Sequence, residues 1–194
     1  MKRTIAFVVF GLFMVSMQVV AQSKPIMGYD KVPWGASVAD VRRAYSISDD
    51  VVLKTNDEDA NLKQLFQDNV TDSIKQRIFN FIDGKLYRVS VLYKDPSDSN
   101  EKNLESILVN RFGRQTNYDI QTGTEYLMFQ PINYTATTKE FGQYSPELVV
   151  DLIHLVYSAG FERDTNNLLG QNQLLVRYTW KKFRDEYQAS KLGL

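Results

Sequence analysis

The chain has 194 residues, in which 23 basic residues balance 23 acidic ones, and it contains one histidine and no cysteine. The absence of cysteine excludes disulfides, thiolate metal sites and the lipid-attachment site of a lipoprotein. The sequence shows neither a basic excess nor a basic stripe, so nucleic acid is not an expected partner. A cysteine-free domain of this size has to be stabilised by its hydrophobic core.

The first 21 residues have the pattern of a secretory signal peptide. Two basic residues precede the apolar run Ile5–Met14, and the small residue Ala21 precedes an expected cleavage site before Gln22. The alternative is an uncleaved N-terminal membrane anchor, since the segment has few polar residues. We expect cleavage, which leaves residues 22–194 as a single periplasmic or secreted domain with no further segment of membrane-spanning length.

A capped helix start follows the leader. Pro33 and Gly35 fit a tight connection, and Ser37 followed by Asp40 is typical of a helix N-terminus. Trp34 has two readings, a ligand-stacking platform or a packing anchor just before the cap, and the second is the commoner use of an aromatic there. The apolar face of this first helix consists of Val38, Val41, Ala44 and Tyr45.

The stretch Val32–Arg42, VPWGASVADVR, resembles the Trp-Gly-x-Ser helix start of small exported bacterial proteins. It is also similar to the Gly-x-Thr-x-x-x-Val helix start of the outer-membrane assembly lipoproteins of the SmpA/OmlA (BamE-like) type. The resemblance covers about a dozen residues. The lipobox cysteine of that family is absent here, and its two helices before the sheet are not evident, so no membrane tether or partner is carried over.

An acidic segment comes next, with a loop over 46–59, a short strand near Val51–Leu53 and a helical turn or two over 61–68. Its spacing partly matches a calcium loop. The match fails because Leu62 stands where the sharp turn needs glycine, and the last ligand is a short aspartate. We therefore expect a solvated acidic loop and no metal site from the matching residues Asp57, Asp59, Asn61 and Asp68.

The clearest local structure is a hairpin over 74–94, in which two alternating runs flank Asp83-Gly84, a pair that favours a two-residue type I′ turn. Pairing outward from that turn predicts one mostly apolar face, covered by a helix. The opposite face is the predicted contact surface, unless another layer or strand buries it. The pairs of the apolar face are Ile82 with Lys85, Asn80 with Tyr87, Ile78 with Val89, Gln76 with Val91 and Ile74 with Tyr93; the predicted binding residues are Phe79, Phe81, Leu86, Arg77 and Arg88, with Trp34.

The remaining elements are predicted from periodicity. A helix from Asn100 carries an apolar stripe through Leu104, Ile107, Leu108 and Phe112 and ends at Gly113 in a left-handed cap. The segment 145–160 is ambiguous between a helix, which its polar stripe favours, and a buried strand. We also predict a strand over 124–132, a loop or a frayed extension over 133–144, a strand over 173–180 and a helix over 181–191. Together these predict an α+β fold, a two-layer antiparallel sheet built on the 74–94 hairpin with helices packed on one face.

The sequence indicates no catalytic chemistry. His154 lies on the polar side of its predicted helix, Glu147 and Asp151 read as a solvated face, and no phosphate-binding glycine motif is present. We expect a non-enzymatic envelope protein without cofactor or metal. It acts either as a protein-binding or accessory module, with a protein partner or as a homo-oligomer, or as a small apolar-ligand carrier with an internal pocket. A carboxylate-only hydrolase is a distant third alternative.

Overall fold

The computed structural model describes residues 28–127, 130–144, 147–158 and 171–193, so the predicted signal segment lies outside the described residues. Strand accounts for 49% of these residues and helix for 24%. The elements are β1 (Gly28–Tyr29), β2 (Val32–Pro33), α1 (Val38–Tyr45), β3 (Lys54–Thr55), β4 (Leu62–Asp68), β5 (Ile74–Ile82), β6 (Lys85–Tyr93), α2 (Asp98–Phe112), β7 (Gln115–Leu127), β8 (Gln130–Phe141), β9 (Leu148–Tyr157), β10 (Gln173–Trp180) and α3 (Lys181–Leu192).

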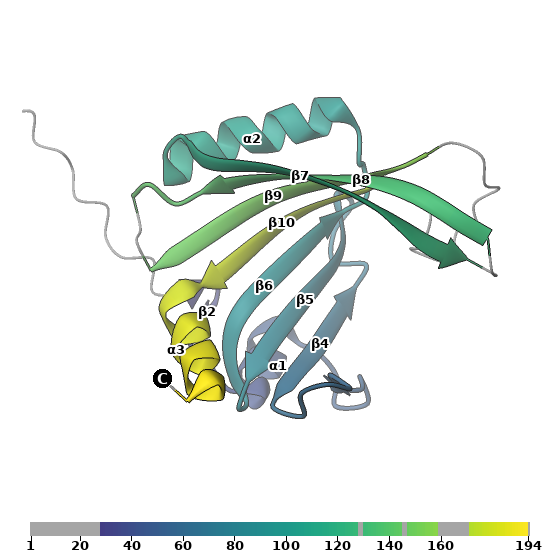
Figure 1. Ribbon diagram of the computed structural model, residues 1–194. Coiled ribbons are helices and arrows are strands. Elements are labelled where there is room, and N and C mark those ends of the chain that lie inside the picture. Colours follow the sequence, from purple (N-terminus) through teal and green to yellow (C-terminus); the bar gives the residue numbers. More distant parts are fainter. Residues whose placement is uncertain (1–27, 128–129, 145–146, 159–170, 194) are drawn as a thin grey trace, which may run out of the picture.

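One antiparallel sheet dominates the described structure, with the strand order β3-β4-β5-β6-β10-β9-β8-β7, and β1 and β2 form a separate two-stranded sheet. The large sheet consists of two halves with the same order of elements, a helix followed by four strands. The last strands of the two halves, β6 and β10, pair at the centre, where Val89 lies opposite Tyr178. Figure 1 shows the continuous, strongly twisted sheet that results.

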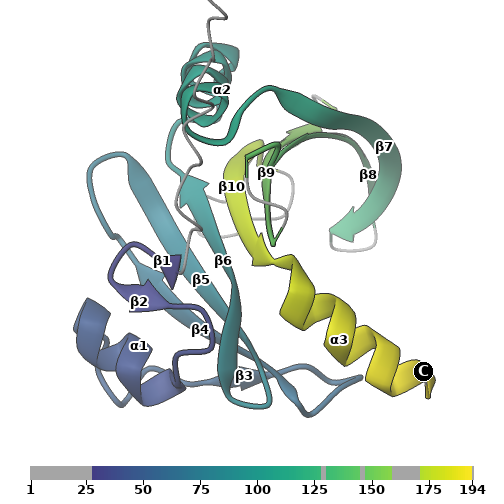
Figure 2. The ribbon, with the colours of Figure 1, turned by 90° about the vertical axis from the view of Figure 1, so that its left-hand side faces the viewer.

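The helices lie on both faces of this sheet. In Figure 2, α1 and α2 lie on one face, which we call the helix face, and α3 lies on the opposite face. The prediction of a two-layer sheet with helices on one face is therefore wrong. The buried side chains of the helix face form two clusters, one around Phe79 under α1 and one around Leu152 under α2, which share Trp34, Tyr93 and Tyr178 as half-buried members.

The predicted hairpin is confirmed as β5 and β6, and Asp83 and Gly84 both have positive φ, 49° and 74°. The predicted register is wrong over the middle of the hairpin because of two bulges. Near the turn, Asn80 pairs with Arg88 and Phe81 with Leu86, which leaves Tyr87 as the extra residue. A one-residue shift exchanges the faces of a strand. The face predicted to be wetter, with Phe79 and Phe81, is consequently the buried one.

Three of the predicted helices are confirmed, but their packing is not as expected. Ser37 and Asp40 form a reciprocal capping box at the start of α1. Gly113 ends α2 with φ of 89°, although its ψ of −178° lies outside the left-handed helical region that was predicted. The apolar stripe of α2 packs with β9 and β10 residues such as Val150 and Val176, whereas α1 covers the hairpin.

Three stretches are strands where the sequence favoured other structure. Residues 62–68 form β4 instead of helical turns, and 133–141 belong to β8 instead of a loop or a frayed extension. Residues 148–157 form β9, which is the buried strand that was the less favoured alternative to a helix. The predicted strand over 124–132 covers parts of both β7 and β8, and the short strand near 51–53 lies at β3 instead. In β9 the helical spacing of polar residues was coincidental, because Asp151 and His154 point to opposite faces of the sheet.

Candidate functional site

The residues predicted as a contact surface do not lie together on the surface. Phe79, Phe81 and Leu86 are each 0% exposed and belong to the core under α1. Arg77 and Arg88 lie on opposite faces of the sheet, since Arg77 pairs with Val91 on β6 and Arg88 pairs with Asn80 on β5. The structure thus places the three apolar residues where no partner reaches them.

Trp34 and Arg88 are both half-buried and packed. Trp34 contacts both clusters of the helix face, and its buried indole nitrogen has no hydrogen-bond partner among the described residues. Arg88 lies over the ring of Tyr87, 5.1 Å from its centroid, and its Nε donates to Thr179 Oγ1 over 3.2 Å. Burial lowers the pKa of this guanidinium. Two interpretations were considered for Trp34, a ligand-stacking platform and a packing anchor. Its contacts with both clusters favour the packing anchor.

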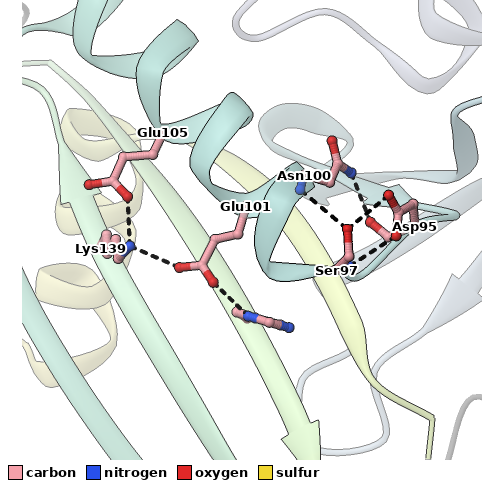
Figure 3. A network of polar contacts seen from close by, with 7 residues as sticks. Asp95, Ser97, Asn100, Glu101, Glu105 and Lys139 are labelled. Carbon is pink, nitrogen blue, oxygen red and sulfur yellow. Dashed lines mark hydrogen bonds and ion pairs between the residues drawn. The ribbon is translucent and has the colours of Figure 1, made fainter.

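A polar network pins the N-terminal half of α2 to the sheet (Figure 3). The Glu101 carboxylate lies 2.9 Å from Lys139 Nζ and 2.7 Å from His154 Nδ1, and Lys139 also pairs with Glu105 over 2.7 Å. Burial would raise the pKa of Glu101, but the hydrogen bonds from Lys139 and His154 outweigh it and hold the pKa below its ordinary value. Burial alone would lower the pKa of Lys139, but its hydrogen bonds to Glu105 and Glu101 outweigh burial and raise the pKa above its ordinary value.

His154 was predicted on the polar surface of a helix, and that prediction is wrong. It lies on β9 under α2 with its side chain only 7% exposed, so it is closed to a substrate. Oxygen or nitrogen atoms of Asp98, Glu101 and His154 lie within 4.8 Å of one another, the spacing of a possible metal site. Both oxygens of Glu101 are already engaged by Lys139 and His154, so the geometry serves helix docking.

The long edge strand β7 is a feature that the sequence prediction missed. β7 has 13 residues, contains neither proline nor lysine, and is the last strand in the order of the large sheet. Two of its large apolar side chains, Tyr118 and Ile120, are 51% and 53% exposed. Gly123 is needed where Tyr134 of β8 crosses it, since a Cβ there would lie 2.5 Å from the tyrosine hydroxyl. A period-2 reading of the whole stretch 115–127 could have indicated the strand.

A groove of about 530 Å³ separates α3 from the sheet. Asp59, a residue of the partial calcium pattern, lies there and accepts hydrogen bonds from the Tyr187 hydroxyl over 2.7 Å and from Lys191, with Nζ at 3.2 Å. The bond from Tyr187 is the largest cause of its lowered pKa. These contacts tie the end of α3 to the loop before β4.

Comparison of the chain with protein-family models, with curated proteins and with solved structures finds no match. Among the helices of the described ranges, none combines the length and the apolar character required to cross a membrane.

Proposed function

We propose that the protein is an exported component of a bacterial cell envelope that works without catalysis, as an accessory module whose β7 edge receives an extended segment of a protein partner. The observation that carries the proposal is the contrast between the two edges of one sheet. β3 at one edge has two residues, whereas β7 at the other has 13. Short strands, proline and lysine normally protect an edge from pairing, and β7 has none of these.

The chemistry of β7 suits strand addition. A partner strand would satisfy the outward N–H and C=O groups of β7, and pockets or patches beside alternate side chains would add selectivity. Tyr118 and Ile120 lie on one face of β7, two residues apart, which is the spacing that such readout requires. A second copy of this chain is a possible partner of the same chemistry, and the test below distinguishes it.

Site-specific photo-crosslinking in the source cell tests this proposal. A photoreactive residue replaces Ile120 on β7, and in a matched control it replaces Val52, which is 72% exposed and lies just before β3 near the other edge. We expect a defined protein adduct from position 120 and none from position 52, and the adduct mass identifies a second copy or another protein. Equal adducts at both positions, or none at position 120, would refute the proposal.

A small apolar-ligand carrier is the second candidate, and the groove under α3 is the observation that favours it. Leu62 and Leu192 line this groove beside the cationic residues Arg88, Arg184 and Lys191. It ranks second because Tyr87 and Ile82, two of the lining residues, are only 7% and 1% exposed and so offer little surface to a ligand. Native mass spectrometry of the protein purified from its own envelope tests it: a small molecule that leaves on denaturation would support the carrier.

A further inference from the structure

A second cavity, of about 320 Å³, lies where the two halves of the large sheet meet on the helix face. We call it the arginine pocket. Its walls come from β1, β5, the end of α2, β9 and β10, so it draws on both halves of the chain. Ligand sites in proteins are frequent at such junctions. The polar and aromatic residues that line it are Tyr29, Asp30, Arg77, Arg111, Phe112 and Tyr178.

The pocket holds more positive than negative charge. Two arginines line it against one aspartate, Asp30, whose carboxylate has the Tyr45 hydroxyl at 3.4 Å. Within the described ranges neither arginine has an acidic partner. The formal balance of the pocket is therefore one positive charge.

Arg77 is the more constrained of the two arginines. Its Nη1 donates to Gln67 Oε1 over 3.3 Å, and its guanidinium lies 5.3 Å from the centroid of the Tyr45 ring. Among the described residues its buried Nε has no hydrogen-bond partner, although the guanidinium also forms a side-chain hydrogen bond with Tyr29. Arg77 as a whole is half-buried, and an anion beside a partly desolvated charge with an unpaired donor would stabilise it.

The aromatic lining supplies both donors and an apolar wall. Burial raises the pKa of Tyr29, although Arg77 opposes the shift, and burial also raises the pKa of Tyr178. Both hydroxyls thus keep their protons near neutral pH and are able to donate. The rings form a continuous group, with Tyr29 and Tyr178 centroids 5.1 Å apart and those of Tyr178 and Phe112 6.1 Å apart.

We propose that the arginine pocket binds a small organic monocarboxylate with a short aromatic or apolar body. One negative charge balances the pocket, and the planar guanidinium fork of arginine matches a carboxylate with two parallel hydrogen bonds. The volume is at the lower end of the range of about 300–1,000 Å³ for ligand pockets, which restricts the ligand to a small molecule. The site is separate from the β7 edge, so neither proposal depends on the other.

Isothermal titration of the purified protein with benzoate tests the proposal, with benzamide as a neutral analogue of the same shape and inorganic phosphate as a different anion. We expect saturable benzoate binding with Kd below about 1 mM, and binding at least about tenfold weaker for benzamide and phosphate. No saturation by benzoate, equal binding of benzamide, or tighter binding of phosphate would each overturn it.

Variants at the end of α2 separate binding from folding. Arg111→Gln changes an exposed side chain, so the fold should remain, and we expect it to weaken benzoate binding about tenfold. Arg114→Gln, three residues further on and also exposed, is the matched control and should leave the affinity unchanged. Equal affinities for the Arg111→Gln variant and the unchanged protein, or an equal loss in the control, would contradict the assignment.

Discussion

Replacement of Glu101 by glutamine should loosen α2 from the sheet. The Glu101 side chain is 14% exposed and accepts two hydrogen bonds from cationic or ring donors, at 2.9 and 2.7 Å. A hydrogen bond to a charged group contributes about 1.5–3 kcal/mol. Glutamine keeps one carbonyl acceptor, and Lys139 keeps Glu105 as a partner. The net loss should therefore correspond to one such bond, about 2 kcal/mol of unfolding free energy.

The matched control for this change is Glu105→Gln. Its side chain is 31% exposed, and Lys139 retains Glu101 in that variant. Glu105 is the more exposed of the two glutamates, so its pair with Lys139 should contribute at most about 1 kcal/mol. Urea denaturation at pH 7, followed by circular dichroism, measures both variants against the unchanged protein. A loss below about 0.5 kcal/mol for Glu101→Gln, or an equal loss in the two variants, would refute the reasoning that this network pins α2.

Two further predictions concern pH and α3. Because the pKa of Glu101 is lowered in the folded protein, the ionised carboxylate stabilises the fold. This stabilisation is complete above pH 4.5, the ordinary pKa of a glutamate, and is lost as the pH falls through the folded-state pKa. The effect of Glu101→Gln on the urea midpoint should therefore shrink in acid. Lys139 has a raised pKa, so its contribution to stability is complete below pH 10.5 and is lost as the pH rises through its folded-state pKa. Tyr187→Phe removes the hydroxyl that donates a hydrogen bond to Asp59, so amide hydrogen exchange in α3 should become several-fold faster. The exposed control Tyr118→Phe should leave exchange in α3 unchanged. Equal exchange in the two variants would contradict the role of this bond.

The sequence predicts best those elements whose signals are local. The Asp83-Gly84 turn, the Ser37 cap and helix α2 each depend on residues a few positions apart, and each is confirmed, although Ile107 of the predicted α2 stripe is 50% exposed. The core role of Phe79 was not predictable in this way, because the bulge at Tyr87 places Val89 instead of Arg88 opposite it. Whether a bulge forms depends on how the neighbouring strands pair and pack, and the two residues of the turn do not indicate it.

The sequence did not predict all of the strands of the second half, for a related reason. β9 is buried on much of both faces, so it lacks the polar and apolar alternation of a half-exposed strand. His154 is buried because α2 crosses above it, and its partner Glu101 lies 53 positions earlier in the chain. No spacing rule joins these two residues, nor does one join Arg77 and Arg111 in one pocket. Such sites arise from sheet topology, which single-sequence periodicity does not specify.

Hydrogen exchange of β7 in the purified complex with its crosslinked partner tests the central claim most directly. In the protein alone, the β7 amides that do not donate to β8 should exchange quickly, because they face solvent at the edge of the sheet. Strand addition predicts that the amides of 117–125 become protected in the complex, while the loop before β3 is unchanged. Unchanged exchange in β7, with protection at another surface, would show that the partner does not add a strand there.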